Sequence, residues 1–336
     1  MWEKNRDLQS LHSFGFQHRA RYFLEIPDLP SLHKALKWIQ SHGGGFFVLG
    51  EGTNLFFTSQ ISRPILRLQF RDKEILRENS QHVYLRVEAG HSWSSLVSYC
   101  LTQGWSGMEN LIDIPGSVGA APVQNIGAYG SEISELIDFV EAIHASTGKP
   151  RVFTPAQCRF KYRESIFKHL PGQYIITHVG LRVNKSFTPR LSYPDLKDLQ
   201  EKKQLSPEEV AHRVSHLRAK KLPKLGNLGH AGSFFKNPIL SQKTYEKLQN
   251  LYSTDFKSLP ISNHQVKISA AELIEKSGWK GFRRGSVGVH PQHALVLVHY
   301  GGGRGSDLLG LAKDITESVQ THSGIRLSPE VEIISQ

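Results

Sequence analysis

Residues 107–130 read GMENLIDIPGSVGAAPVQNIGAYG, and the rest of the chain is best interpreted outward from this stretch. Five of its residues are glycine, and alanine occupies several positions between them. Glycine tolerates positive φ angles and lets another group approach the main chain closely, because it has no Cβ. The stretch therefore predicts a loop that holds a ligand through its backbone. A glycine-rich surface loop is the alternative.

Two amide side chains, Gln124 and Asn125, lie in the middle of this stretch among small or apolar neighbours. An amide offers both donors and acceptors, so it can pair with the edge of a heteroaromatic ring. We expect these two residues to contact a cofactor.

The composition is that of a globular protein with more than one domain. The chain has 336 residues, enough for two or three domains of about 100–200 residues each. Hydrophobic residues make up 39% and charged residues 21%, and no run approaches the roughly 18 apolar residues that a membrane span needs. The polar beginning, MWEKNRDLQS, lacks the features of a secretory signal. With two cysteines there is no disulfide framework, so we expect a cytoplasmic protein.

A formal net charge of +11 indicates an anionic partner. Lysine and arginine are scattered rather than interleaved with aromatic residues along one stripe. This distribution favours phosphate-bearing small molecules. A basic nucleic-acid-binding module remains the alternative from another functional class.

Another glycine-containing turn lies earlier in the chain than the stretch at 107–130. Ser31 is expected to cap a helix with apolar residues over 32–39, and a short strand over 46–49 follows. The strand leads into GEGTN at 50–54, which is suited to presenting N–H groups to a pyrophosphate. One such turn is weak evidence, and its value lies in recurring with 107–130.

The middle of the chain predicts an α+β domain. Residues 83–89 alternate as a half-buried strand, and a helix begins at Trp93. Strands are expected over 137–145 and 174–183. A GxGxxG fingerprint opening a helix is missing, which argues against a Rossmann domain.

A domain boundary is predicted just before Ser206. Ser206-Pro207-Glu208-Glu209 combines a capping serine, a proline at the first helical position and a glutamate at the third. Beyond it, helical and strand patterns alternate, with helices over 270–276 and 308–319 and a strand over 294–300.

Three histidines, His290, His293 and His299, raise the question of a metal site. On a strand His293 and His299 would share one face. They are not accompanied by a convergent set of cysteines or carboxylates, so we expect no metal.

Five motifs in order resemble the UDP-N-acetylenolpyruvoylglucosamine reductase family. They are GEGTN at 50–54, IPGSVGAAPVQNIGAYG at 114–130, CRFKYRESIF at 158–167, AGSFFKNP at 231–238 and LSPEV at 327–331. LSYPDL at 191–196 resembles the subtype in which a tyrosine loop covers the bound substrate.

This resemblance implies an α+β fold with a two-part FAD-binding domain of the PCMH/vanillyl-alcohol-oxidase type and a C-terminal α/β substrate domain. The implied boundaries are 10–68 and 69–205 for the FAD-binding subdomains and 206–328 for the substrate-binding domain, with a C-terminal strand over 329–336 returning to the active site.

The resemblance also implies an NADPH-dependent flavoenzyme of peptidoglycan synthesis that reduces UDP-N-acetylglucosamine enolpyruvate, acts in the cytoplasm and is a monomer. The FAD-binding residues would be Gly50, Glu51, Gly52, Thr53, Asn54, Leu55, Ile114, Pro115, Gly116, Ser117, Gly119, Ala120, Gln124, Asn125, Gly127, Ala128 and Tyr129. The substrate-binding residues would be Tyr162, Tyr193, Lys221 and Asn237, and the catalytic residues Arg163, Ser233 and Glu330.

Each catalytic residue also has an ordinary structural explanation. Arg163 can form a surface ion pair with Glu164, and Ser233 can be a turn or cap residue. Glu330 competes with Glu332, which would lie on the same face of a strand. An FAD-dependent oxidase of the same fold would explain the two glycine-rich segments but not the motifs around Ser233 and Glu330.

Overall fold

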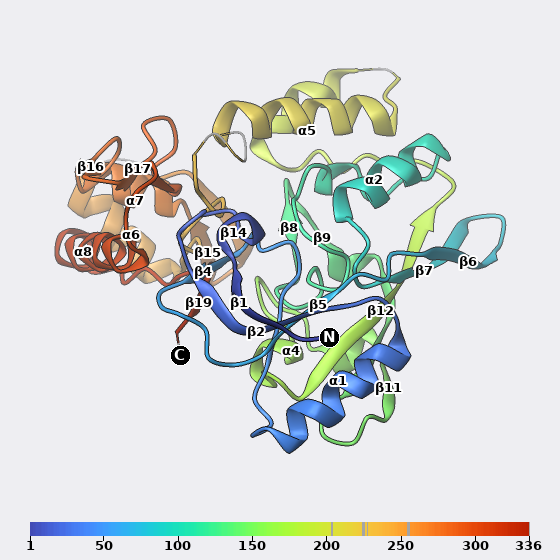
Figure 1. Ribbon diagram of the computed structural model, residues 1–336. Coiled ribbons are helices and arrows are strands. Elements are labelled where there is room, and N and C mark those ends of the chain that lie inside the picture. The colour runs from blue at the N-terminus through green and yellow to red at the C-terminus, as the bar shows by residue number, and fades with distance from the viewer. Residues whose placement is uncertain (203, 224–225, 227, 254–255, 336) are drawn as a thin grey trace. The chain divides into compact units, whose positions relative to one another are not determined.

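The computed structural model describes residues 1–202, 204–223, 226, 228–253 and 256–335 (Figure 1). These residues form two compact units. The first contains Met1–Arg6, Ala20–Gly52 and Ser62–Lys220, and the second contains Asp7–Arg19, Thr53–Ile61 and Lys221–Gln336. Among the described residues, no helix has both the length and the apolar character needed to cross a bilayer.

The first unit contains a four-stranded sheet in the order β1-β2-β5-β3. Its strands are β1 (Glu3–Asp7), β2 (Arg19–Ile26), β5 (Ile65–Leu68) and β3 (Phe47–Val48). Strand β5 runs parallel to both β2 and β3, and helix α1 (Leu29–Ser41) packs its apolar face into the same core as this sheet.

The N-cap of α1 differs from the prediction. Asp28, rather than Ser31, caps the helix, and its carboxylate accepts a hydrogen bond from the Ser31 N–H at 2.7 Å. Pro30 lies in the first turn, where its fixed φ and missing N–H suit a helix start, so the helix begins before Ser31.

A five-stranded antiparallel sheet in the order β11-β10-β12-β7-β6 forms the larger layer of the first unit. Its strands are β11 (Pro150–Phe153), β10 (Ile137–His144), β12 (Tyr174–Asn184), β7 (His82–Glu88) and β6 (Lys73–Glu78). Helix α2 (Trp93–Thr102) packs on it through a core that includes Trp93 and Leu96. The predicted strands and helix of this region are confirmed.

Shorter elements complete the first unit. They are 3-10 helices η2 (Glu109–Leu111), η3 (Ile133–Glu135) and η4 (Pro194–Glu201), strands β8 (Gly127–Ala128) and β9 (Ser131–Glu132), and helices α3 (Pro155–Cys158), α4 (Ile166–His169) and α5 (Pro207–Lys221). The predicted capping box of α5 is present, because Ser206 Oγ accepts from the Glu209 N–H at 3.2 Å and Glu209 accepts from the Ser206 N–H at 2.9 Å.

The second unit mixes helices with small sheets. Its elements are η1 (Gln9–Leu11), β4 (Leu55–Phe57), β13 (Ile239–Ser241), α6 (Gln242–Tyr252), β14 (Ser258–Ser262), β15 (Gln265–Ile268), α7 (Ala270–Lys276), β16 (Arg283–Arg284), β17 (Val287–Val289), β18 (Leu297–His299), α8 (Gly305–Ser323) and β19 (Glu332–Ile334). The sheets have the orders β13-β15-β14, β16-β17-β18 and β19-β4. One core that includes Phe14, Phe234 and Leu308 holds them together.

Strand β18 is shorter than predicted, and His293 precedes it outside any strand. The idea that His293 and His299 share a strand face was therefore wrong. The described residues contain no group of three His, Cys, Asp or Glu side chains placed to hold a metal ion.

Candidate active site

The two glycine-rich segments meet in the first unit. The Glu51 carboxylate accepts a hydrogen bond from the Gly116 N–H at 3.0 Å. Gly52 and Gly116 have φ angles of 69° and 136°, which side chains rarely allow. A Cβ on Gly50 would lie 2.8 Å from the Ser117 hydroxyl oxygen. The turn at 50–54 and the stretch at 107–130 are therefore in direct contact.

The side-chain amide of Asn125 holds the stretch at 107–130 in place through hydrogen bonds within the chain. It is fully buried and donates to the Glu132 carboxylate at 2.6 Å and to the Lys161 carbonyl at 3.1 Å, while its own carbonyl accepts from the Ser134 N–H. Asn125 also has a φ of 47°, an uncommon conformation for a residue with a side chain. These contacts hold the loop in a conformation that its sequence alone does not favour.

The other predicted cofactor residues vary in exposure. Gly50, Glu51, Thr53, Asn54, Ile114, Pro115, Gly116, Gly119, Gln124, Gly127, Ala128 and Tyr129 are half-buried, Gly52, Leu55 and Ser117 are buried, and Ala120 is exposed. A Cβ on Gly119 would come within 2.5 Å of the Ala89 Cβ. Gly119 is therefore required for packing of the loop on β7 and its continuation, whatever else it does.

Arg163 is directed toward the glycine-rich stretch. Its guanidinium donates to the Gly127 carbonyl at 2.6 Å, and its φ of 55° is a strained conformation for an arginine. Glu164 pairs with His169 at 2.8 Å. The Arg163 guanidinium also lies over the Tyr162 ring, 5.4 Å from its centroid. The Arg163 guanidinium is thus bonded to the backbone of the glycine-rich stretch.

Tyr193 packs on the same stretch. Its ring meets that of Tyr129 edge to face, with centroids 5.1 Å apart, and burial raises the pKa of Tyr129 to about 12. The Asn110 amide donates to the carbonyls of Tyr129 and Arg190, at 2.8 and 3.0 Å. The segment carrying Tyr193 is therefore tied to the stretch at its base as well as through the ring.

The segments that carry Ser233 and Glu330 pair in the second unit although they are far apart in sequence. The Glu330 N–H donates to the Phe234 carbonyl at 2.8 Å, and Phe235 forms a bridge with Pro329. The Asn54 amide donates to the Glu330 carbonyl at 3.3 Å. Three of the five motifs thus converge on one place.

The two glutamates of the last motif differ in exposure. Glu330 is half-buried and precedes β19, whereas Glu332 begins that strand and is exposed. The two residues are thus not both in the strand that the sequence suggested they might share.

The remaining predicted substrate residues also lie in the second unit. The Asn237 side-chain carbonyl accepts from the Ala270 N–H at the start of α7, at 2.9 Å. Burial, helped by the positive charges of Lys221 and nearby basic groups, lowers the pKa of His293 to about 4. Burial therefore favours the neutral form of His293.

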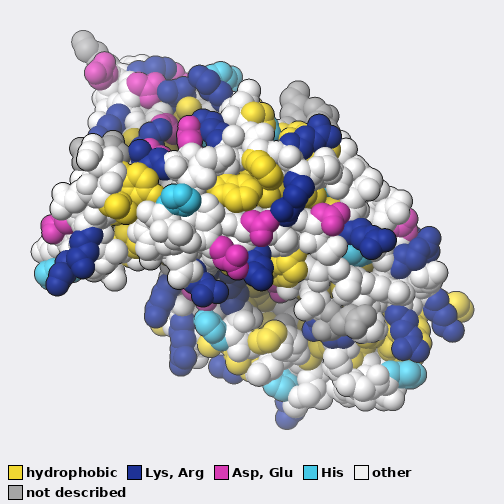
Figure 2. Space-filling model, turned by 90° about the vertical axis from the view of Figure 1, so that its left-hand side faces the viewer, with side chains coloured by type: hydrophobic (Ala, Val, Ile, Leu, Met, Phe, Trp, Pro, Cys, Tyr) yellow, Lys and Arg dark blue, Asp and Glu magenta, His cyan; other side chains and the backbone are white. Residues whose placement is uncertain are grey.

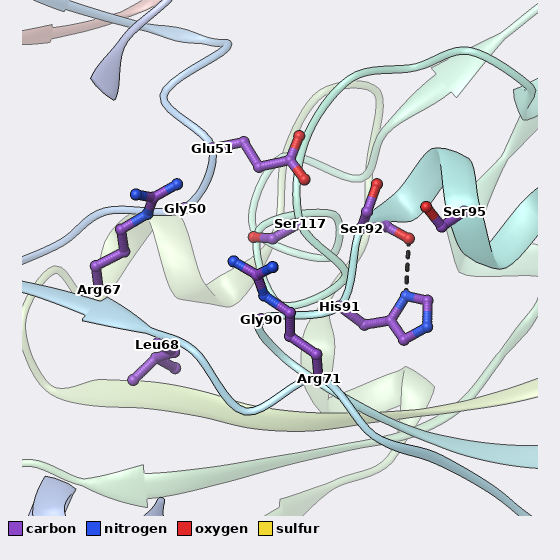
Figure 3. A pocket seen from close by; sticks show the side chains of 10 residues that line it. All are labelled: Gly50, Glu51, Arg67, Leu68, Arg71, Gly90, His91, Ser92, Ser95 and Ser117. Carbon is purple, nitrogen blue, oxygen red and sulfur yellow. Dashed lines mark hydrogen bonds between the residues drawn. The ribbon is translucent and has the colours of Figure 1, made fainter. Parts of the chain in front are cut away.

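A cavity of about 370 Å³ opens beside the two glycine-rich segments in the first unit (Figure 3). Its lining residues are Gly50, Glu51, Arg67, Leu68, Arg71, Gly90, His91, Ser92, Ser95 and Ser117. Sequence reasoning identified only Gly50, Glu51 and Ser117 of these. Gly90 was a signal for the remaining lining residues, because it lies between a predicted strand and a predicted helix. Loops that a rigid scaffold positions often carry binding residues.

Known proteins are similar to this chain over nearly its whole length. Residues 22–153 match the family described as "FAD binding domain", and residues 224–334 match "UDP-N-acetylenolpyruvoylglucosamine reductase, C-terminal domain". The chain is 41% identical to a UDP-N-acetylenolpyruvoylglucosamine reductase from Amoebophilus asiaticus, covering 99% of both chains. It is 38% identical to the enzyme of that name from Pseudomonas aeruginosa, covering 98% of this chain and 97% of the relative.

One solved structure matches over the full length as well. The crystal structure of UDP-N-acetylenolpyruvylglucosamine reductase from Thermus caldophilus has a TM-score of 0.70 and 25% sequence identity, covering 100% of this chain and 99% of that chain. These matches agree with the predicted α+β architecture of a FAD-binding domain followed by a separate C-terminal domain.

Proposed function

The chain belongs to the UDP-N-acetylenolpyruvoylglucosamine reductase family. On that premise we propose that it reduces the enolpyruvyl group of UDP-N-acetylglucosamine enolpyruvate to give UDP-N-acetylmuramate for peptidoglycan synthesis, with NADPH as the hydride donor. The observation that supports this proposal is the pairing of 234–235 with 329–330, which joins the segment that follows Ser233 to the backbone of Glu330, where the Asn54 amide also donates.

The residues of the first unit fit FAD. Glycines with positive φ, the Glu51–Gly116 hydrogen bond and the adjoining cavity give a backbone wall with polar groups along it. The chemistry that FAD supplies when bound is the transfer of hydride from NADPH to the substrate. We propose that the turn at 50–55 and the stretch at 114–129 hold it, with Asn125 acting through the loop that its amide stabilises.

The chain's own residues complete the reduction. Addition of hydride to C3 of the enol ether places negative charge on C2 and the adjacent carboxylate, and a proton must then reach C2. Ser233 is the proposed proton donor, with Glu330, whose backbone N–H bonds the Phe234 carbonyl, as the proposed acidic partner. Arg163, held by the Gly127 carbonyl, is proposed to stabilise the charge on the substrate carboxylate.

The proposal assigns Tyr162, Tyr193, Lys221 and Asn237 to substrate binding. Lys221 offers a positive charge to the nucleotide phosphates, and the Tyr193 hydroxyl is proposed to reach the substrate from a loop of the tyrosine-loop subtype. We also propose a cytoplasmic monomer.

We retain the predicted boundaries, with subdomains at 10–68 and 69–205, a substrate-binding domain at 206–328 and a returning segment at 329–336, of which Gln336 lies outside the described residues. These boundaries follow the resemblance rather than the two compact units.

The family assignment favours this reductase over an oxidase of the same fold and over a nucleic-acid-binding module. In Figure 2 the lysine and arginine side chains on the visible face are dispersed among other residues rather than gathered in one stripe, as the sequence indicated.

An anaerobic titration tests the proposal. The purified protein should carry flavin absorbance, lose it on addition of NADPH, and recover it when UDP-N-acetylglucosamine enolpyruvate is added. A colourless protein that binds no flavin would refute the assignment. Bleaching without recovery on addition of the enolpyruvyl substrate would refute the substrate.

A further inference from the structure

One buried side chain connects the glycine-rich stretch to residues 190–193, which we call the Tyr193 segment. The Asn110 amide nitrogen donates to the Tyr129 carbonyl at 2.8 Å and to the Arg190 carbonyl at 3.0 Å. The residue is 1% exposed, and its Oδ1 is buried without a hydrogen-bond partner among the described residues. Both amide hydrogens are therefore used, and the reversed orientation would place Oδ1 against two carbonyl oxygens.

The 3-10 helix η2 gives this amide a fixed base. All three of its residues, Glu109, Asn110 and Leu111, are buried. The Glu109 carboxylate accepts from the Gly107 N–H at 2.6 Å, and the Trp93 indole donates to the Leu111 carbonyl at 2.9 Å. The amide thus projects from a packed turn, so it sets the position of the segments that it bonds rather than following them.

Two further contacts hold the Tyr193 segment against the glycine-rich stretch. The Arg190 guanidinium pairs with the carboxylate of Glu135 in η3. Gly130, with a φ of 84°, passes close to the segment, and a Cβ added there would lie 3.9 Å from the Tyr193 Cβ. The backbone at Tyr193 is therefore close to the stretch, as its ring is to that of Tyr129.

The other side of the segment packs on apolar side chains. Leu191 is buried in a cluster with Leu196, Val210 and Val214, and Tyr193 packs against this cluster. Apolar contacts stabilise the segment but are not directional. Hydrogen bonds and ion pairs have defined geometry, so the contacts on the Asn110 side are the ones that fix where Tyr193 lies.

We infer that Asn110, assisted by the Arg190–Glu135 ion pair, is a positioning residue for substrate binding. Its two hydrogen bonds hold the Arg190 carbonyl at a fixed place relative to Tyr129, and this places the Tyr193 hydroxyl for the sugar nucleotide. The inference rests on the proposed function, in which Tyr193 binds the substrate. It adds a residue that acts only through the segment and contacts no ligand.

The structure suggests the size of the effect. When a site is formed in only a fraction of the molecules, its apparent affinity falls by that fraction. Each buried hydrogen bond changes such an equilibrium by about two- to tenfold. Asn110→Ala removes two of them, so the Kd for the enolpyruvyl sugar nucleotide should rise about tenfold.

The test uses full-length, flavin-loaded Asn110→Ala and Asn110→Asp. Asp keeps the shape of Asn but turns a carboxylate oxygen toward two carbonyls, so it should be at least as damaging as Ala. The matched control is Gln40→Ala, because the Gln40 amide also donates to two carbonyls, those of Ala145 and Ser146, at 3.0 and 2.8 Å. Calorimetry gives the Kd, stopped-flow absorbance gives flavin reduction by NADPH, and melting temperature monitors the fold.

Both Asn110 variants should raise the Kd while flavin content and the rate of flavin reduction stay close to wild type. Gln40→Ala should leave the Kd unchanged even where it lowers the melting temperature. In a Tyr193→Phe background, Asn110→Ala should raise the Kd by less than about threefold, because the hydroxyl through which it acts is already absent. This lack of additivity separates positioning from a general loss of stability.

A second variant reads the same segment from its exposed side. Glu135→Gln removes only the ion pair with Arg190 and should raise the Kd about two- to threefold, since exposed ion pairs contribute little. Added salt should raise the Kd of wild type more than that of this variant. If neither Asn110 variant folds, a wild-type Kd in Glu135→Gln would overturn the inference.

Three other outcomes would also overturn it. One is an unchanged Kd in either folded Asn110 variant. Another is a pair of losses that multiply in the Asn110→Ala, Tyr193→Phe double variant. The third is flavin loss or slower flavin reduction in proportion to the rise in Kd, which would place the role of Asn110 in the cofactor loop. A wild-type Kd in Tyr193→Phe alone would instead refute the substrate role that the proposed function gives to Tyr193.

Discussion

Replacing Ser233 by alanine separates a proton donor from a structural serine. Ser233 is half-buried and follows Gly232, whose φ is 69°, and it precedes the fully buried Phe234. No helix of the described chain begins between 222 and 241, so Ser233 is not a helix cap. The Phe234 N–H donates to the Leu295 carbonyl at 2.8 Å and anchors the backbone without the serine hydroxyl.

Ser233→Ala should therefore change the stability of the fold and the rate of proton transfer by very different amounts. Loss of stability should stay below about 1 kcal/mol, because the substitution opens no large cavity and leaves the backbone bonds in place. Loss of a general acid should slow the proton-dependent step by roughly 10²–10⁴-fold, equivalent to about 3–5 kcal/mol of barrier.

Anaerobic stopped-flow measurement of the two half-reactions distinguishes these effects. Reduction of the flavin by NADPH should proceed at close to the wild-type rate, while reoxidation by the enolpyruvyl substrate should collapse. Ser318→Ala, on α8, is the matched control and should change neither half-reaction. Reoxidation of the Ser233→Ala protein within a few-fold of wild type would refute the role of Ser233, and equal losses in both half-reactions would indicate a damaged site.

Three further predictions concern the cofactor, the tyrosine loop and acid stability. Gly52→Val should give largely flavin-free protein, because a β-branched residue disfavours the φ of 69° at this position, and full flavin occupancy measured by absorbance would contradict the cofactor assignment. The same loss in Gly119→Val would be less informative, since its Cβ collides with Ala89. Tyr193→Phe should weaken sugar-nucleotide binding, measured by calorimetry, but leave flavin reduction by NADPH intact, because Phe preserves the ring packing; an unchanged Kd would count against the loop. Burial lowers the pKa of His12 from 6.5 to about 4, so the unfolded chain takes up a proton before the folded protein does, and about 2 kcal/mol of stability should be lost between pH 7.5 and pH 5. Denaturant unfolding at both pH values would show this loss in wild type and a smaller one in His12→Gln, and equal losses would exclude His12 as the source.

Local patterns predicted the secondary structure well where a helix or strand is long and amphipathic. Helix α7 has the predicted bounds, and α8 includes the predicted apolar face and ends at Gly324 with the left-handed cap that glycine favours. Predictions failed at boundaries, as at Asp28, which caps α1 in place of Ser31, and at β18, which is shorter than predicted.

Motif order identified the family but not the geometry of its residues. Asn125 was predicted to contact a cofactor, and that remains a prediction; within the chain its amide is bonded to Glu132, Lys161 and Ser134. Side-chain amides serve loops and ligands equally well, so residue type could not separate the two roles.

The sequence by itself determined which backbone positions favour glycine and which segments form the long helices, because these depend on local φ preferences and on side-chain type. Only the tertiary structure decided that the Glu330 backbone pairs with Phe234, and that Arg67 and Arg71 border the cavity at Ser117. Such neighbours are separated by tens to hundreds of residues along the chain. Their proximity follows from strand pairing and core packing, which no local pattern specifies.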